Sequence, residues 1–137
     1  NDTLGHAAGD RAIQAFAKVL RSCCRSQDII ARTGGEEFVV VIPGASIAHA
    51  ETVAERIQDT LREISGRIGV PEFTASFGVA ESLDRRNYEE LMRLADAALY
   101  EAKRAGRDCI RRASEAAQML VAEGDVDSAI SEAATSA

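Results

Sequence analysis

The fold is decided by the stretch Arg32-Thr33-Gly34-Gly35-Glu36-Glu37-Phe38. An apolar run at residues 29–31 precedes it, and a longer one at residues 38–42 follows it. Two apolar runs rich in β-branched residues on either side of a Gly-Gly pair predict a β-hairpin. The second run is apolar throughout, so we expect a central strand that is covered on both faces.

The turn of this hairpin combines two glycines with two acids. Gly34 and Gly35 have no side chain and tolerate positive φ, which leaves backbone N–H groups open to a phosphate. The carboxylates of Glu36 and Glu37 repel each other, and Mg²⁺ relieves such repulsion because it prefers oxygen ligands. The turn is therefore a candidate site for phosphate and metal. Taken alone, the turn is better explained as a solvated hairpin tip that carries two surface acids; the rest of the chain changes that balance.

Length and composition indicate one globular domain. The chain has 137 residues, of which 46% are hydrophobic and 28% charged, enough for a buried core. No apolar run approaches the ~20 residues of a membrane span, and no signal peptide precedes the first element. The net charge of −6 argues against a nucleic-acid binder, which needs a basic face. A nucleotide substrate remains compatible because a metal offsets local negative charge.

The cysteines indicate a reducing compartment. Cys23, Cys24 and Cys109 are odd in number and lack metal-ligand spacing. We expect all three to be free thiols of the core, and the domain to be cytoplasmic.

Three amphipathic runs with capping signals predict three helices. Their expected bounds are residues 10–24, 46–66 and 87–106, with Asp10, Ser46 and Asn87 as N-caps. Further strands are expected at residues 73–80 and 108–111. The order helix, hairpin, helix, strand, helix, strand predicts an α+β domain with a mostly antiparallel central sheet and flanking helices.

Four motifs occur in a fixed order along the chain. They are Asn1-Asp2-x-x-Gly5-His6-x-x-Gly9-Asp10, Gly34-Gly35-Glu36-Glu37-Phe38, Thr74-x-Ser76-x-Gly78-Val79-Ala80 and Ala95-Asp96-x-Ala98-Leu99-Tyr100-x-Ala102-Lys103-x-x-Gly106-Arg107. Together they make residues 1–111 resemble the catalytic domain of the GGDEF family, the diguanylate cyclases. The resemblance implies a palm-like nucleotidyl-cyclase fold with a ferredoxin-like core.

The resemblance also implies an activity and its residues. Diguanylate cyclases condense two GTP into cyclic di-GMP and release two pyrophosphates, with two cyclase domains facing each other as a homodimer. Glu36 and Glu37 correspond to catalytic residues that hold Mg²⁺ or Mn²⁺. The substrate-binding positions that match the family are Asn1 and Asp10 for guanine, Gly34 and Gly35 at the triphosphate, and Lys103 and Arg107 for phosphate. His6 is assigned a structural role.

A second ligand site is implied by Arg25-Ser26-Gln27-Asp28. This segment matches the R-x-x-D inhibitory site at which cyclic di-GMP gives allosteric product inhibition, and Arg56 resembles a secondary arginine of that site. An arginine pairs two ways with phosphate or guanine, and an aspartate accepts hydrogen bonds from guanine. The alternative for Arg56 is an ordinary exposed helix residue.

The sequence also departs from the family pattern. The family's first strand, which carries a metal-binding aspartate, is expected just before Asn1 and is absent from this chain. We therefore expect a partial domain at residues 1–111, poorly active when isolated, in a parent protein that also carries a sensory or receiver domain. Residues 112–137 form an acidic, Ala/Ser-rich tail, which we expect to be weakly helical or a connector. Thr33 stands where the family often has an aromatic residue, with a small expected effect.

Two other functions are compatible with the motifs. One is a catalytically idle GGDEF domain that senses GTP or cyclic di-GMP. The other is a cyclase that makes a monomeric cyclic nucleotide, which leaves the R-x-x-D segment without a role. Intact Glu36, Glu37, Lys103 and Arg107 favour the diguanylate cyclase.

Overall fold

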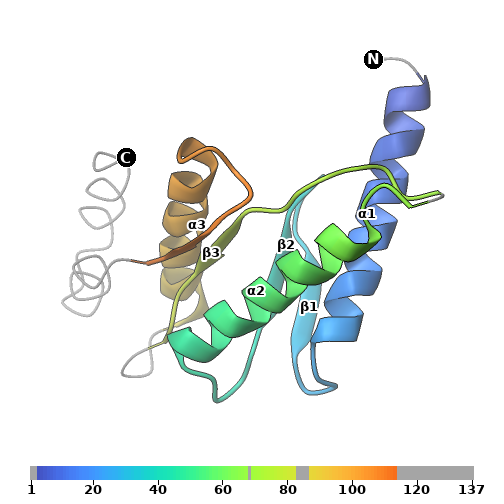
Figure 1. The fold of residues 1–137 in the computed structure, drawn as a ribbon. Coiled ribbons are helices and arrows are strands. Elements are labelled where there is room, and N and C mark those ends of the chain that lie inside the picture. The colour runs from blue at the N-terminus through green and yellow to red at the C-terminus, as the bar shows by residue number, and fades with distance from the viewer. Residues whose placement is uncertain (1–2, 68, 83–86, 114–137) are drawn as a thin grey trace. The chain divides into compact units, whose positions relative to one another are not determined.

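The computed structural model describes residues 3–67, 69–82 and 87–113. The elements in these ranges are α1 (Thr3–Cys23), β1 (Ile29–Arg32), β2 (Phe38–Val41), α2 (Ile47–Ile64), β3 (Phe77–Val79), α3 (Tyr88–Arg104) and β4 (Ile110–Arg112) (Figure 1). The chain divides into two compact units, Asn1–Gly44 with Glu55–Thr74, and Ala45–Ala54 with Ala75–Ala137. Helix α2 thus contributes to both. The predicted α+β class is confirmed, whereas Asn1 and most of the predicted tail lie outside the described residues.

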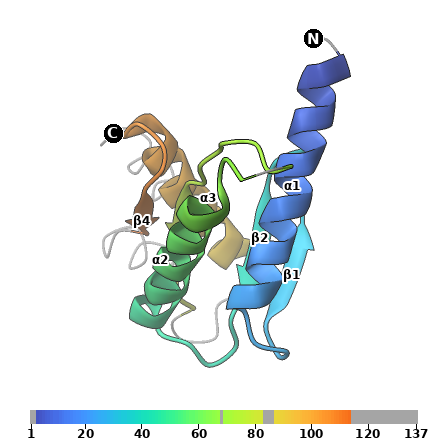
Figure 2. The same cartoon turned by 45° about the vertical axis from the view of Figure 1, so that its right-hand side comes forward.

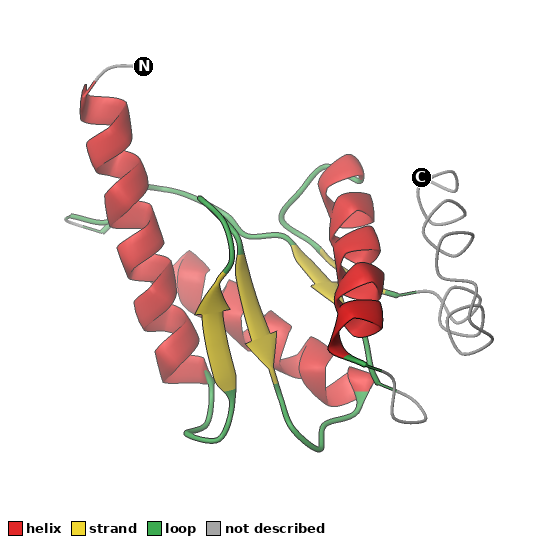
Figure 3. Ribbon diagram, turned by 180° about the vertical axis from the view of Figure 1, so that it is seen from behind, coloured by secondary structure: helices red, strands yellow, loops and turns green. Residues whose placement is uncertain are grey.

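The first unit contains the predicted hairpin. Strands β1 and β2 pair antiparallel, with Ile29 opposite Val41 and Arg32 opposite Phe38, and they lie side by side in Figure 3. The residues of β2 are half-buried, and within the described ranges its one partner is β1. The prediction of a central strand covered on both faces is therefore wrong for β2.

Helix α1 is longer than predicted. It begins at Thr3, so Asp10 lies inside the helix rather than at its N-cap. Two glycines, Gly5 and Gly9, precede the predicted start at Asp10, but a helix interior tolerates an isolated glycine at a cost of about 1 kcal/mol. Ala7 and Ala8 between those glycines are the strongest helix formers. Helix α1 runs along the hairpin (Figure 2).

Helix α2 begins and ends as predicted. The Ser46 hydroxyl accepts a hydrogen bond from the His49 N–H at 3.2 Å, and Gly66 follows the helix with φ +81°. In the first unit, the buried hydrophobic side chains come from the C-terminal parts of α1 and α2: Val19, Leu20, Cys23, Ile57 and Leu61. All three cysteines are free. No described helix is long and apolar enough to cross a membrane.

The second unit contains a strand–helix–strand arrangement. Strands β3 and β4 pair in parallel, with Phe77 opposite Ile110, and α3 connects them. The predicted strand at residues 73–80 is shortened to β3 because the Phe73 N–H instead donates to the Ser65 hydroxyl at 3.1 Å. A parallel pair was not predicted, since the sequence indicated mostly antiparallel pairing.

Gly78 brings β3 close to α3. A Cβ atom at this position would lie 2.2 Å from the Ala95 carbonyl oxygen and 2.3 Å from the Leu99 nitrogen. The fold therefore requires glycine here for close backbone approach. The glycine of the Thr74–Ala80 motif has a packing role.

Helix α3 has the predicted ends. The Asn87 side chain accepts a hydrogen bond from the Glu90 N–H at 2.9 Å, which confirms the N-cap. At the other end Gly106 adopts φ +112°, which confirms the expected glycine just beyond the helix. Buried Leu94, Ala98 and Ala102 form the inner face of the helix.

Candidate functional site

The hairpin tip consists of residues 33–37, between β1 and β2. The Thr33 N–H donates to the Glu37 carbonyl at 2.9 Å and closes the turn. The Arg32 guanidinium then bridges the tip: Nε donates to the Gly34 carbonyl at 3.1 Å, and Nη2 donates to the Gly35 carbonyl at 2.7 Å. One side chain thus fixes two successive peptide groups.

This arrangement determines where the tip's N–H groups point. A trans peptide directs its C=O and N–H in opposite directions, so the N–H groups of Gly35 and Glu36 face away from the Arg32 guanidinium. The tip residues are exposed, and these two N–H groups have no hydrogen-bond partner within the described ranges. They are available to an anion.

The two glycines of the tip are not required by their backbone angles. Gly34 and Gly35 tolerate positive φ, but neither adopts it; among the described residues the glycines with positive φ lie elsewhere. A Cβ at Gly35 would meet nothing within 4 Å, and one at Gly34 would meet the Glu37 Cβ at 3.8 Å, an ordinary contact. The fold therefore does not require glycine at position 35. Close approach of a ligand to the backbone would require it.

The acids of the tip suit a cation that also binds phosphate. Glu36 and Glu37 are both exposed. The described ranges contain no group of three or more His, Cys, Asp or Glu placed to hold a metal. Mg²⁺, however, is usually bound by one or two carboxylates together with substrate phosphates rather than by an all-protein cage. Two carboxylates beside free N–H groups fit that kind of site.

Aromatic packing anchors the tip on α1. The ring of Phe38, the residue after Glu37, stacks on Phe16 with centroids 5.3 Å apart and an interplanar angle of 8°. Phe73 packs on the same Phe16 ring at 6.4 Å. Stacked aromatic pairs contribute about 0.5–1.5 kcal/mol beyond their buried area. This contact fixes the base of the loop that carries both acids.

The C-terminal end of α1 brings together the three residues of the predicted inhibitory site. The Asp28 carboxylate accepts a hydrogen bond from the Arg25 N–H at 2.8 Å and lies 3.6 Å from the Arg25 guanidinium. Arg56 of α2 donates to the Cys23 carbonyl at 3.4 Å. The Asp28 side chain is 3% exposed and that of Arg25 is 52% exposed. Arg25 is therefore accessible, whereas Asp28 holds the turn.

Cys24 lies within the same cluster. Burial raises the pKa of the Cys24 thiol above its ordinary value of 9.0, and the negative charge of Asp28 raises it further, against the opposing effect of Arg56. The thiol is thus protonated at neutral pH and has little nucleophilic character.

The exit of α3 carries the predicted phosphate ligands. Lys103 lies in the last helical turn, whereas Arg107 lies beyond the helix end and has φ +66°. Lys103 and Arg107 therefore do not lie on one helical face, although they are four positions apart in the sequence. The Arg107 side chain is exposed.

The predicted guanine-reading residues are only partly described. Asp10 is exposed on α1, and Asn1 lies outside the described ranges.

The chain matches the family "Diguanylate cyclase, GGDEF domain" over residues 1–109. It belongs to the GGDEF family. Among curated relatives of this domain, diguanylate cyclase DgcM of Escherichia coli K12 is 41% identical over 108 residues, covering 79% of this chain and 26% of that protein. Diguanylate cyclase A of Treponema denticola is 42% identical over 114 residues, covering 79% and 30%. This chain thus spans about a quarter to a third of these relatives.

Solved GGDEF structures have the same fold. Diguanylate cyclase SiaD of Pseudomonas aeruginosa, solved with its activator SiaC, has a TM-score of 0.72 and 40% identity over 82% of this chain and 44% of that chain. The GGDEF domain of DgcB from Caulobacter crescentus, solved with c-di-GMP, has a TM-score of 0.71 and 33% identity, over 82% and 69%. These neighbours confirm the palm-like fold expected from the sequence.

Two residues of interest were missed in the sequence. Arg32 was given no role from the sequence, although a basic residue two positions before a Gly-Gly turn is within reach of the turn carbonyls. Ser76, in the third motif, accepts a hydrogen bond from the Asp108 N–H at 3.1 Å. No sequence signal links residues 32 positions apart in this way.

Proposed function

We propose that this GGDEF domain is a diguanylate cyclase that condenses two GTP into cyclic di-GMP and two pyrophosphates. One observation carries the proposal. The Arg32 guanidinium holds the Gly34 and Gly35 carbonyls, so two N–H groups face outward directly beside the carboxylates of Glu36 and Glu37. Outward N–H groups bind anions, and carboxylates bind the cations that accompany nucleotide phosphates.

Each residue then has a defined part in the reaction. The N–H groups of Gly35 and Glu36 bind phosphate oxygens, and Glu36 and Glu37 hold Mg²⁺ or Mn²⁺. The chemistry supplied by the bound metal is neutralisation of charge on the phosphates and the attacking oxygen. Glu36 is also the candidate acceptor of the 3′-hydroxyl proton when that oxygen attacks the α-phosphate of the second GTP and pyrophosphate leaves.

Other residues orient the nucleotide. Lys103 and Arg107 bind phosphate oxygens, and Asp10 with Asn1 reads guanine. A carboxylate accepts hydrogen bonds from the N1 and N2 groups of guanine, which adenine lacks, and an unpaired polar group makes such discrimination steep. Because each domain holds one GTP, the reaction needs two domains facing each other.

The test is incubation of the protein, at its natural length, with GTP and Mg²⁺, followed by mass spectrometry. We expect cyclic di-GMP from the wild type and none above background from Glu36→Ala. Glu63→Ala, which removes an exposed carboxylate of α2, is the matched control and should leave turnover unchanged. A cyclic mononucleotide as product would refute the diguanylate cyclase. GTP or cyclic di-GMP binding without any product would instead identify a sensor domain.

We further propose that Arg25, Asp28 and Arg56 form a site for cyclic di-GMP that gives product inhibition, in which Arg25 contacts the ligand and the nearly buried Asp28 holds the turn that carries Arg25. The support is their convergence at the end of α1, with the half-exposed Arg25 guanidinium as the accessible donor. Arg25→Ala should raise the cyclic di-GMP concentration that halves turnover by about tenfold or more, since charge-assisted hydrogen bonds contribute about 1.5–3 kcal/mol. Arg62→Ala is the control, because Arg62 forms a similar i,i+3 pair with Asp59 at 3.3 Å. Equal inhibition of all three proteins would refute this site.

A further inference from the structure

The turn after α3 contains an unusual run of backbone angles. Gly106, Arg107 and Asp108 have φ values of +112°, +66° and +46°. Left-handed angles suit glycine but are disfavoured for residues with a side chain. Two such residues in succession, next to a helix end, persist only where neighbouring groups hold them, and strained positions of this kind gather at functional sites.

The helix end holds the first part of the turn. The Gly106 N–H donates to the Lys103 carbonyl at 3.4 Å, and the Arg107 N–H donates to the Ala102 carbonyl at 3.1 Å. This pair of bonds is the common way in which a helix ends at a glycine. It explains positive φ at Gly106, but it does not extend to Asp108.

The second part of the turn is held by Ser76. The Ser76 hydroxyl accepts a hydrogen bond from the Asp108 N–H at 3.1 Å. The next residue along the chain, Phe77, donates its N–H to the Cys109 carbonyl at 2.9 Å. Ser76, the residue before β3, therefore fastens Asp108 where the turn between α3 and β4 lies beside the start of β3. Figure 2 shows β4 beside α3, immediately after this turn.

We propose that Ser76 is a positioning residue for Arg107. By holding Asp108 in its left-handed conformation, the hydroxyl sets the direction in which the exposed Arg107 side chain leaves the backbone. Ser76 does not touch the nucleotide itself. The inference rests on the proposed function, in which Arg107 binds a GTP phosphate.

The hydrogen bond from the Asp108 N–H to the Ser76 hydroxyl lies at the surface. We therefore expect its loss to change the stability of the fold little and the affinity for GTP more. In Ser76→Ala the Asp108 N–H can bond to water instead, and the fold loses little. The turn, however, loses the contact that favours its strained form. Other conformations become populated, and the affinity for phosphate falls in proportion to the competent fraction.

The experiment compares serine variants in the protein at its natural length. Calorimetry gives the Kd for GTP with Ca²⁺ in place of Mg²⁺ to suppress turnover, and thermal unfolding gives the stability. Ser76→Ala should weaken GTP binding roughly fivefold, the factor for one ordinary hydrogen bond, and Ser76→Thr, which keeps the hydroxyl, should restore it. Ser65→Ala is the matched control, because Ser65 accepts a backbone N–H at the same 3.1 Å distance in the other unit. Because the Ser65 bond is partly buried, Ser65→Ala should lower the melting temperature at least as much as Ser76→Ala and leave the Kd unchanged.

A second variant tests the conformational step. Asp108→Gly removes the penalty for positive φ, so Ser76→Ala should weaken GTP binding much less in an Asp108→Gly background. The same Kd for wild type and Ser76→Ala would overturn the inference, as would an equal loss with Ser65→Ala.

The inference and the proposed function can fail separately. If the wild type does not bind GTP, the proposed function is refuted, and so is the role of Arg107 in binding phosphate. The amide NMR signals of Arg107 and Asp108 then decide the remaining part. Signals that shift in Ser76→Ala would support the hydroxyl as the group that sets the turn, and unchanged signals would overturn it.

Discussion

Replacement of Gly35 by alanine should affect the stability of the fold and the turnover of GTP in opposite directions. Gly35 has no positive φ, and a Cβ built on it meets nothing within 4 Å. A Gly→Ala change at such a position usually stabilises a protein by about 0.4–1 kcal/mol, because the unfolded chain loses freedom. For a domain of this size we therefore expect an unchanged melting temperature or a rise of a few degrees.

The same methyl group should harm GTP turnover. It would lie beside the N–H groups of Gly35 and Glu36, where we place phosphate oxygens. Loss of one charge-assisted hydrogen bond costs about 1.5–3 kcal/mol, which corresponds to a roughly 10- to 150-fold lower kcat/KM. The assay is cyclic di-GMP formation from GTP with Mg²⁺, together with thermal unfolding of the same samples.

Gly78→Ala provides the contrast for this experiment. Its Cβ would lie 2.2 Å from a backbone oxygen of α3, so it should lower the melting temperature and reduce activity only through lost fold. If Gly35→Ala retained full turnover, or if it lost turnover only in step with stability, the assignment of the tip to phosphate would be refuted.

Three further substitutions test separate parts of the structure. Arg32→Lys keeps the positive charge but cannot fork to both glycine carbonyls, so kcat/KM should fall about tenfold; unchanged turnover would show that the tip does not need the guanidinium. Asn87→Ala should lower the unfolding free energy by about 1 kcal/mol in denaturant titrations because it removes the N-cap of α3, and a null effect would contradict that cap. The hydrogen bond from Arg112 lowers the pKa of Glu51 below its ordinary 4.5. Its stabilisation is therefore complete above pH 4.5 and lost as the pH falls through the lowered pKa, so Glu51→Gln should melt slightly below the wild type at pH 7, with a gap that closes in acid.

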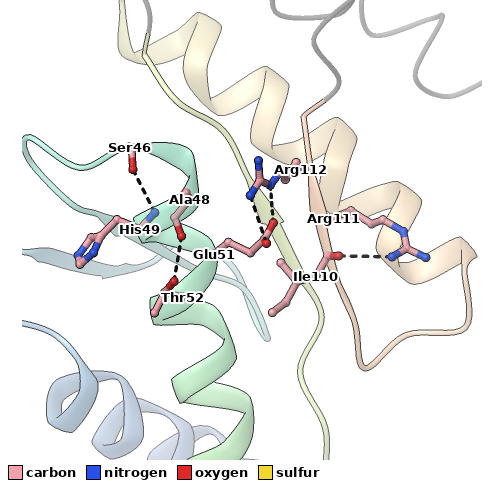
Figure 4. Close-up of polar contacts among 8 residues, drawn as sticks. All are labelled: Ser46, Ala48, His49, Glu51, Thr52, Ile110, Arg111 and Arg112. Carbon is pink, nitrogen blue, oxygen red and sulfur yellow. Dashed lines mark hydrogen bonds and ion pairs between the residues drawn. The ribbon is translucent and has the colours of Figure 1, made fainter.

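The Glu51–Arg112 pair is an ionic link between α2 and β4 in the second unit. Figure 4 shows the two side chains facing each other, with Arg112 Nε 2.5 Å from Glu51 Oε2 and Nη2 3.3 Å from Oε1. Their positions are 61 residues apart, and no local sequence pattern predicts the pairing. The hydrogen bond between Ser46 and His49 at the start of the same helix was predictable, because a capping serine is recognisable from local sequence alone.

Local signals accounted for most of the fold. The hairpin, the caps at Ser46 and Asn87 and the glycine at Gly106 were predicted because each depends on residues within a few positions. The start of α1 was mispredicted because two glycines outweighed the alanines between them. Strand β3 was overextended because the Phe73 N–H donates to the Ser65 hydroxyl and the Phe73 ring packs on Phe16, contacts that only the folded chain creates.

The candidate site was predictable in its residues but not in its geometry. The motif identified Gly34, Gly35, Glu36 and Glu37, and the sequence indicated that the glycines leave N–H groups uncovered. The structure adds that neither glycine adopts positive φ and that a Cβ at Gly35 would meet nothing within 4 Å. The guanidinium of Arg32 and its two carbonyl bonds depend on side-chain conformation, which sequence spacing does not determine.

The most direct test of the central claim is an amide NMR titration of the protein with GTP, with Ca²⁺ in place of Mg²⁺ to prevent turnover. The claim is that GTP phosphates bind at the hairpin tip through the N–H groups of Gly35 and Glu36. We predict that these two amides show the largest downfield shifts in the hairpin, and that Glu36→Ala weakens the response while Glu63→Ala does not. Saturable GTP binding that leaves both amides unmoved would contradict the account.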